Sequence, residues 1–178
     1  MAQLVMKRPR GAAALGTPST IAVREANDAD AEGLAKVLGA AFPEQQWTAA
    51  RVHKELLDAP DVPAVFVIDD NGKVVATASA RYVERFPVSG YVHWVAVDPQ
   101  HRGKRLGNVA MERVLWRFFN DGRDTAILET DDVRLPAITS YLGLGFIPHY
   151  TEADHEDRWS HVFGLLARAR RRAKEISK

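Results

Sequence analysis

Residues 98–107, which read Asp-Pro-Gln-His-Arg-Gly-Lys-Arg-Leu-Gly, constrain this chain more than any other stretch. An apolar run, residues 91–97, precedes them, and a strongly helical pattern follows. The pattern predicts a buried strand that breaks at Pro99, crosses a basic loop containing a glycine and enters a helix at about Leu106. Such a loop directs backbone N–H groups, cationic side chains and a helix N-terminus toward one point. The stretch therefore predicts a polyphosphate-binding site.

Composition excludes several classes of protein. The 178 residues are enough for one domain with a sizeable core, and the 26% of charged residues is ordinary for a soluble protein. The net charge of +1 argues against a chain that binds polyanions over its whole surface. Because there is no cysteine, disulfides, thiolate metal sites and a cysteine nucleophile are excluded. No apolar run reaches the roughly 18–20 residues that a membrane span requires.

The first 20 residues lack hydrophobic periodicity, and prolines and glycines are spread through them. Their basic cluster follows the one short apolar stretch, which is the reverse of the order in a secretory signal. We therefore expect residues 1–20 to be a disordered tail and the protein to be cytoplasmic, with an export or organelle address as the alternative.

The C-terminal end carries a cluster of cations on a predicted helix at about residues 155–177. Cations complement the negative end of a helix dipole, so a solvated face is the favoured interpretation. A surface for nucleic acid or an acidic partner is the alternative, and no aromatic interleaving supports it. The cluster comprises Arg168, Arg170, Arg171, Arg172 and Lys174.

Apolar spacing and turn residues predict a three-layer α/β fold in which helices flank a central mixed sheet. Asp69-Asp70-Asn71-Gly72 is a strong hairpin signal between two of the strands. The predicted strands are 21–25, 64–68, 74–83, 91–97, 125–128 and one from Phe146. The first predicted helix follows the cap residues at 27–30. The other predicted helices occupy residues 48–58, 106–120, 135–144 and 155–177. Residues 21–178 contain no repeat and no linker, which predicts a single domain.

Two motifs in this order resemble those of the GCN5-related N-acetyltransferase (GNAT) superfamily. Residues 95–99 followed by Arg-Gly-Lys-Arg-Leu-Gly at 102–107 are similar to its acyl-CoA motif, Arg/Gln-x-x-Gly-x-Gly/Ala. Residues 135–146, Leu-Pro-Ala-Ile-Thr-Ser-Tyr-Leu-Gly-Leu-Gly-Phe, resemble its second motif. The stretch from Val23 to Leu34, which opens the predicted domain, is also typical of the superfamily. The resemblance runs from Ile21 to about Tyr150.

The resemblance implies a GNAT-like fold and an N-acetyltransferase that uses acetyl-CoA without a metal. It implies that the backbone of Val95 and Val97 pairs with pantetheine and that a local bulge leaves one N–H facing the carbonyl oxygen of the thioester. The positions that the resemblance assigns to acyl-CoA are Val95, Ala96, Val97, Arg102, Gly103, Lys104, Arg105, Leu106, Gly107, Asn108, Arg134, Ala137 and Tyr141.

The chain departs from the superfamily pattern in three places. Arg105 stands where a glycine is usual, and its Cβ favours an ordinary negative φ, which narrows the approach of a phosphate. Its guanidinium would compensate by binding a phosphate. Arg134 stands where many members have Asn beside the pantetheine arm. The usual last strand is replaced by the pattern of the terminal helix.

Three side chains are candidates for the chemistry. Tyr141 is in the motif position credited with contacting the sulfur, and its phenol is a donor that can protonate the leaving thiolate. His93 and Tyr91 share one strand face. Arylalkylamine acetyltransferases carry His at the position of His93, so this imidazole is a candidate base that relays a proton through water. A packed Tyr and a core His are the alternatives, and Glu84 is a weaker candidate base.

Other functions are weighed against acetyl transfer. A non-catalytic acyl-CoA-binding or regulatory module uses the same scaffold, and an RNA- or ribosome-associated role through the basic terminal helix is a third hypothesis, although nucleic acid is not the expected partner. P-loop and Gly-x-Ser-x-Gly signatures are absent. The spacing of His149, Asp154, His155 and His161 fits no standard metal site. The sequence leaves open whether the amine acceptor is a small molecule, a peptide or a protein. It also leaves open whether the protein forms a homodimer.

Overall fold

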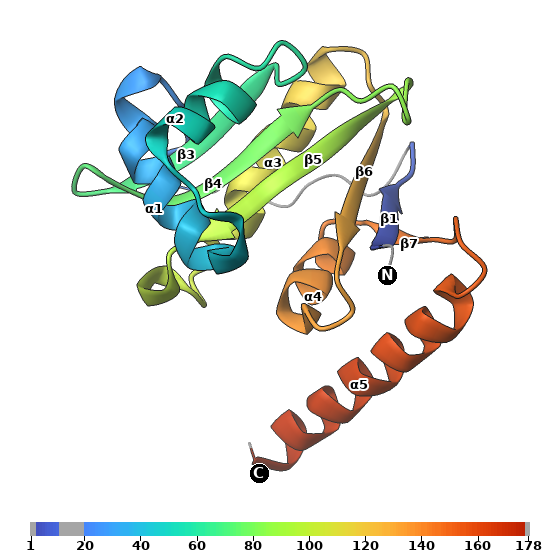
Figure 1. Cartoon of the computed structure of the whole chain (residues 1–178). Helices are drawn as coiled ribbons and strands as arrows, with labels where there is room; N and C mark the ends of the chain where they lie inside the picture. The colour runs from blue at the N-terminus through green and yellow to red at the C-terminus, as the bar shows by residue number, and fades with distance from the viewer. Residues whose placement is uncertain (1–2, 11–19, 177–178) are drawn as a thin grey trace. The chain divides into compact units, whose positions relative to one another are not determined.

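The computed structural model describes residues 3–10 and 20–176, and these residues form two compact units. The first unit comprises residues 20–126, and the second comprises residues 3–10 with 127–176. Figure 1 shows the elements of both. The predicted motifs are divided between them, with the basic loop in the first unit and Tyr141 in the second.

The first unit is organised around an antiparallel sheet with strand order β2-β3-β4-β5. A tight turn joins β3 (Ala64–Asp70) to β4 (Lys73–Arg81), and both turn residues, Asn71 and Gly72, have positive φ, as the predicted hairpin requires. The edge strand β2 (Arg24–Glu25) is shorter than the predicted 21–25 and is exposed. The strand on the other side of β4 is β5 (Ser89–Val97).

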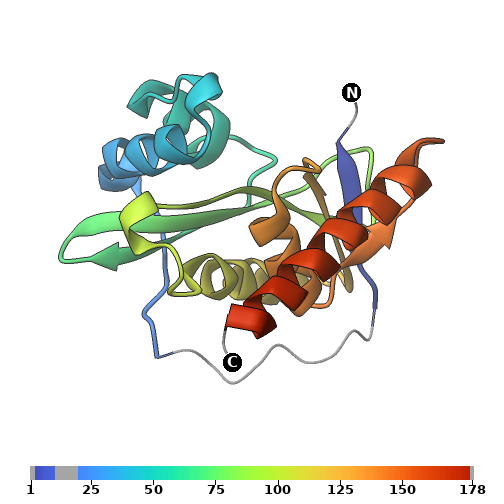
Figure 2. The same cartoon turned by 90° about the horizontal axis from the view of Figure 1, so that it is seen from below.

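Helices cover both faces of this sheet, as Figure 2 shows. The capping box of Asn27 and Asp30 starts a short 3₁₀ turn, η1 (Asp28–Asp30), and α1 (Ala31–Ala41) follows it. A second short 3₁₀ turn, η2 (Pro43–Gln45), precedes α2 (Ala49–Val52), and α2 continues as a π-helical turn, η3 (His53–Leu57). The opposite face packs against α3 (Leu106–Asn120), which follows a third 3₁₀ turn, η4 (Pro99–His101). This unit therefore has the predicted layers of helix, sheet and helix.

The second unit contains the strand order β6-β1-β7. β6 (Thr125–Thr130) begins at the end of the first unit, and α4 (Leu135–Gly143), β7 (Ile147–His149) and α5 (His155–Ile176) follow. The last helix matches the predicted helix at 155–177, although residue 177 lies outside the described residues. Trp159 and Val162 are fully buried on α5, whereas the cationic cluster from Arg168 to Lys174 is exposed. Exposure is what a solvated, dipole-compensating helix end requires.

The expectation of a disordered tail over residues 1–20 is wrong for Leu4–Arg8, which form β1. This strand is central, with β6 on one side and β7 on the other. Its pairing with β7 is antiparallel, with Val5 opposite His149. Because β1 is buried on both faces at Leu4, Val5 and Met6, it is a continuous apolar run without the alternation of a half-buried strand. Residues 11–19 lie outside the described residues.

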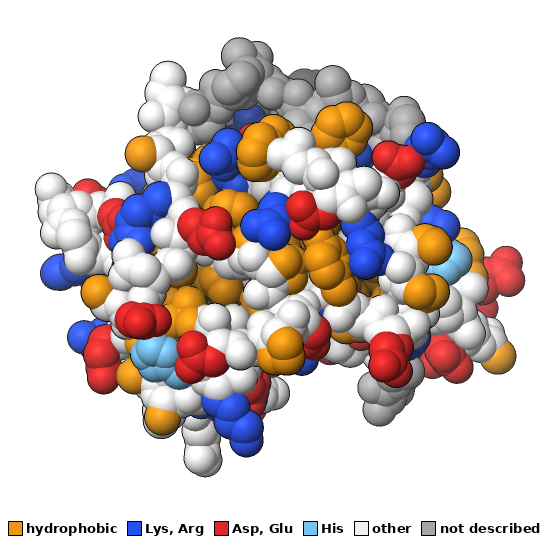
Figure 3. Space-filling view, turned by 90° about the horizontal axis from the view of Figure 1, so that it is seen from above, with side chains coloured by type: hydrophobic (Ala, Val, Ile, Leu, Met, Phe, Trp, Pro, Cys, Tyr) orange, Lys and Arg blue, Asp and Glu red, His pale blue; other side chains and the backbone are white. Residues whose placement is uncertain are grey.

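Among residues 3–10 and 20–176, no helix combines the length and the apolarity needed to cross a membrane. Charged side chains of both signs are interspersed with apolar ones over the face in Figure 3. That mixture agrees with the net charge of +1.

Candidate active site

A β-bulge interrupts β5 at Trp94. Thr77 of β4 lies opposite Ala96 and Ser79 lies opposite His93, so β5 contains one more residue than β4 in this interval. Trp94 has a φ of 47°, in the left-handed region. A bulge of this kind turns one residue out of the ladder and leaves its backbone groups without the regular partners. The structure thus contains the bulge that the resemblance implies.

The bulge changes which side chains share a face of β5. Trp94 contacts the rings of both Phe42 and Trp47, at 5.0 and 4.9 Å between ring centroids, so it lies on the face toward α1 and α2. The side chains of Val95 and Val97 lie on the other face, toward Gly107 at the start of α3. In a regular strand, Val95 and Val97 would share the face of His93. The bulge therefore separates an aromatic face from a valine-lined face.

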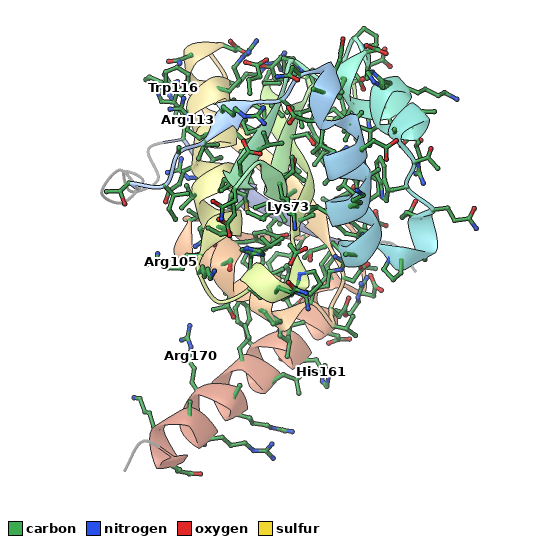
Figure 4. The ribbon with its side chains drawn as sticks, turned by 90° about the vertical axis from the view of Figure 1, so that its left-hand side faces the viewer. Lys73, Arg105, Arg113, Trp116, His161 and Arg170 are labelled. Carbon is green, nitrogen blue, oxygen red and sulfur yellow. The ribbon has the colours of Figure 1, made fainter. Side chains whose placement is uncertain are left out.

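The loop between β5 and α3 adopts a sharply turned conformation. Asp98 accepts a hydrogen bond from the backbone N–H of Gln100 at 2.8 Å and so caps η4. Gly103 has a φ of +80°, and Arg105 has a φ of 60° immediately before the first residue of α3. The side chains of Arg102, Lys104 and Arg105 are exposed, and Figure 4 shows Arg105 at this end of α3. Successive N–H groups, a helix N-terminus and three exposed cations meet here, which suits a polyphosphate.

The expectation that Arg105 takes a negative φ is wrong. Arg105 occupies the left-handed conformation that glycine would occupy, at a cost of about 1–2 kcal/mol for a residue with a Cβ. The loop therefore keeps the backbone conformation of the superfamily pattern although Arg105 replaces the usual glycine. The direction of the chain into α3 requires this left-handed conformation. The surrounding structure offsets the strain.

His101 ties this loop to the β3–β4 hairpin. Its Nε2 lies 3.0 Å from a carboxylate oxygen of Asp70, and its Nδ1 lies 3.2 Å from a carboxylate oxygen of Asp98. The hydrogen bonds to Asp70 and to Asp98 raise the pKa of His101 above its usual value. The protonated imidazolium donates to both carboxylates, so the tether is strongest where His101 is protonated and the carboxylates are ionised, and it weakens as the pH rises through the raised pKa of His101.

A row of aromatic rings lies along the α1-facing side of β5. Phe86 stacks on Tyr91 at 6.2 Å, Tyr91 lies 5.5 Å from His93, and His93 lies 4.7 Å from Trp94. The row continues to Phe42 and Trp47, which are buried in the core. The alternation of side chains along a strand predicts that Tyr91 and His93 share a face, and the structure brings their rings together.

His93 has a charged neighbour that the sequence analysis missed. Arg81 Nη1 lies 3.4 Å from His93 Nδ1, and Arg81 Nε donates to a carboxylate oxygen of Asp61 at 2.6 Å. Burial and, next, the charge of Arg81 lower the pKa of His93 to about 4. The imidazole is therefore neutral at pH 7. Residues 61, 81 and 93 have no motif spacing that would link them. The pairing of the predicted strands that carry Arg81 and His93 was the one feature that could have indicated this contact.

The second unit carries Tyr141 on α4. Its ring lies 6.3 Å from that of Phe146 in an edge arrangement, and its carbonyl accepts from the N–H of Phe146 at 3.0 Å. Burial raises the pKa of Tyr141 to about 12, so the phenol keeps its proton at neutral pH. Arg134, at the start of the same helix, forms an ion pair with Asp131 at 3.1 Å, and Ala137 follows on the first turn.

The residues weighed as metal ligands are not gathered into a site in the described part of the chain. His155 is fully buried, and its Nδ1 accepts from the backbone N–H of Thr151 at 3.2 Å, which is a structural role. One group among the described residues, Asp28, His53 and Asp58, has ligand atoms within 4.8 Å of one another. Both its carboxylates are exposed, and such groups are common without an ion.

A family model described as the acetyltransferase (GNAT) family matches residues 23–146, which is more than half of the chain. The chain belongs to the GNAT acetyltransferase family. N-acetyltransferase 8B of Rattus norvegicus is 33% identical over 85 residues, which are 46% of this chain and 38% of that protein. The match thus spans well under half of the length of this relative.

Solved structures show the same GNAT fold. An acetyltransferase described as putative from Agrobacterium tumefaciens str. C58 superposes with a TM-score of 0.63 at 24% identity, covering 74% of this chain and 96% of that one. Ribosomal-protein-alanine N-acetyltransferase from Brucella melitensis gives 0.62 at 21% identity, covering 71% and 85%. These likenesses confirm the predicted fold class, an α/β GNAT fold.

Arg105 offers a test of the GNAT loop in this chain. We expect Arg105→Gly to raise the free energy of unfolding by up to about 1 kcal/mol, because the left-handed strain disappears while the flexibility of glycine offsets part of the gain. The same substitution is expected to weaken acetyl-CoA binding by about tenfold through loss of a charged contact. Urea unfolding and isothermal titration measure the two effects.

Arg105→Asn is the matched control, because Asn tolerates the left-handed region but carries no charge. Its affinity is expected to match that of Arg105→Gly. Tighter binding of acetyl-CoA by Arg105→Gly than by the wild type would show that Arg105 contributes nothing to the cofactor contact.

Proposed function

We propose that this protein is an N-acetyltransferase that transfers the acetyl group of acetyl-CoA directly to a primary amine in a ternary complex. Membership in the GNAT family supports acyl transfer. The observation that carries the proposal is the pairing of two features on one strand, the bulge at Trp94 and the cationic loop that follows it. The bulge would supply a backbone donor that is turned out of the strand ladder, and the loop would supply a phosphate site.

The loop fits the cosubstrate by its chemistry. The backbone N–H groups between Arg102 and Asn108, with the N-terminus of α3, would hold the pyrophosphate. The exposed cations Arg102, Lys104 and Arg105 add charge. The backbone of Val95, Ala96 and Val97 would hold the pantetheine arm as an added strand. Acetyl-CoA supplies an activated thioester, and the protein supplies positions and hydrogen bonds.

The chain's own groups account for the steps of the transfer. An N–H at the bulge would donate to the carbonyl oxygen as negative charge develops there. The amine nitrogen forms a bond to the carbonyl carbon, the carbon–sulfur bond breaks, and the amine proton passes to water. Tyr141 would donate its phenolic proton to the departing thiolate and would then regain a proton from water, and its raised pKa keeps the phenol protonated beforehand. Arg134 and Ala137 would lie beside the pantetheine arm.

Release of free thiol from acetyl-CoA in the presence of a panel of amines and peptide N-termini tests the proposal. We expect Tyr141→Phe to lower kcat about 100-fold with little change in the KM for acetyl-CoA, because it removes a proton donor without removing a ring. Tyr150→Phe is the matched control, since Tyr150 is an exposed tyrosine, and it is expected to behave as the wild type.

Two results would contradict this proposal in different ways. Acetyl-CoA binding without thiol release above background would favour the non-catalytic binding module. Thiol release that is equal in Tyr141→Phe and the wild type would leave the acetyltransferase intact and remove Tyr141 from the mechanism.

A further inference from the structure

Asp61, Arg81 and His93 form a chain of hydrogen bonds within the first unit. Arg81 ends β4, and its register partner is Tyr91, two residues before His93, so Arg81 and His93 are diagonal neighbours on adjacent strands. Asp61, in the segment before β3, accepts from Arg81 Nε at 2.6 Å, and Arg81 Nη1 lies 3.4 Å from His93 Nδ1. Both Arg81 and Asp61 are partly buried.

The identity of the donor fixes the tautomer of His93. A guanidinium has five N–H donors and no acceptor, so Nδ1 of His93 must be the acceptor in this contact. A neutral imidazole has one protonated nitrogen, and that nitrogen is therefore Nε2. In the described part of the chain, Nε2 itself has no hydrogen-bond partner.

This tautomer is unsuited to general base catalysis. Nε2 has no free lone pair, and the lone pair of Nδ1 faces Arg81. A proton taken at Nδ1 would create an imidazolium next to the guanidinium and would break the hydrogen bond between them. Among the residues that the structure describes, Arg81 and Tyr91 are the charged or titratable groups beside the ring, and the nearby carboxylate of Asp61 is already engaged by Arg81.

We propose that Arg81, held by Asp61, fixes His93 as an Nε2–H hydrogen-bond donor, and that His93 positions the amine acceptor instead of accepting its proton. Tyr91 at 5.5 Å and Trp94 at 4.7 Å contact the imidazole and hold its plane. Arg81 and Asp61 are thus positioning residues. The role toward the acceptor rests on the proposed acetyltransferase function, whereas the tautomer does not.

Nitrogen-15 NMR of the imidazole side chains tests the tautomer without any substrate. We expect the wild type to show His93 protonated at Nε2 alone, with no titration between pH 5 and pH 8. In Arg81→Met we expect both tautomers and a pKa displaced upward by at least one unit. Arg113→Met removes an exposed arginine from α3 and is the matched control, with the His93 signals unchanged. An Nδ1–H tautomer in the wild type would overturn the proposal.

Two substitutions of His93 separate a donor from a base. His93→Gln keeps an N–H donor and is expected to lower kcat/KM for the amine about fivefold, whereas His93→Phe keeps a ring without a donor and is expected to lower it about 100-fold. A general base would make both variants lose activity by a similar factor of at least 100 and would remove an inflection from the pH profile. That outcome would overturn the donor role.

Failure of the proposed function gives a different pattern. If the wild type transfers no acetyl group to any amine, the acetyltransferase proposal fails, while the NMR spectra still decide whether Arg81 sets the tautomer. If transfer occurs and Arg81→Met shows the wild-type tautomer, the inference fails while the acetyltransferase stands.

Discussion

Gly107→Glu is expected to lower the affinity for acetyl-CoA by about 100-fold while the protein remains folded. Gly107 is in the first turn of α3, next to the proposed phosphate site, and an added Cβ would lie 3.3 Å from Val97 Cγ2 of the strand proposed to hold pantetheine. Loss of one contact to a charged group, about 2.7 kcal/mol, corresponds to this factor. The glutamate itself favours the helix, because a negative charge complements a helix N-terminus.

Isothermal titration with acetyl-CoA measures the affinity, and thermal unfolding shows that the fold is kept. Gly107→Gln has the same bulk without the charge, so we expect it to lose only about tenfold in affinity. An affinity equal to that of the wild type in a folded Gly107→Glu protein would place the cofactor phosphates elsewhere on the molecule.

Gly90→Ala is expected to lower the free energy of unfolding by about 3 kcal/mol. Gly90 lies in β5 against the buried ring of Phe118 of α3, and a Cβ at this position would overlap the ring carbons. The ring is fully enclosed and has little room to move, so the strand and the helix must separate. Denaturant unfolding measures the loss, and two-state behaviour is a condition of the measurement.

A second Gly→Ala substitution provides the comparison. Gly39 is on α1, and a Cβ there would meet nothing within 4 Å, so Gly39→Ala is expected to stabilise the protein by about 0.5–1 kcal/mol. In the double variant Gly90→Ala/Phe118→Leu, the smaller side chain should restore part of the stability. Equal effects of Gly90→Ala and Gly39→Ala would show that the overlap with Phe118 is relieved without cost.

The sequence predicted the elements whose signals are local. Asn71 and Gly72 have the φ values that a tight hairpin needs, Asn27 and Asp30 form a capping box, and α3 begins at the predicted Leu106. Each of these depends on residues within a few positions of one another. The family motifs added the expectation of a bulge, which periodicity alone does not contain.

The errors arise where distant residues decide the structure. Leu4 to Met6 form a central strand because β7, more than 140 positions away, supplies a partner. Arg105 adopts a glycine conformation because the path of the chain into α3 outweighs a local preference of about 1–2 kcal/mol. Arg81 reaches His93 only through the pairing of β4 with β5. None of these has a fixed spacing that a single sequence displays.

The position of β1 sets an order for synthesis and folding. The first unit is built from residues 20–126, so its sheet and helices can form while the rest of the chain is still being made. Val5 is synthesised before the residues of the first unit, whereas its partner His149 is synthesised after them. Leu4, Val5 and Met6 first meet a neighbouring strand when β6 is made, and the second arrives with β7, so closing these long loops is slow. This apolar segment must be kept from aggregating during that interval, and the arrival of β7 completes the strands on both sides of β1.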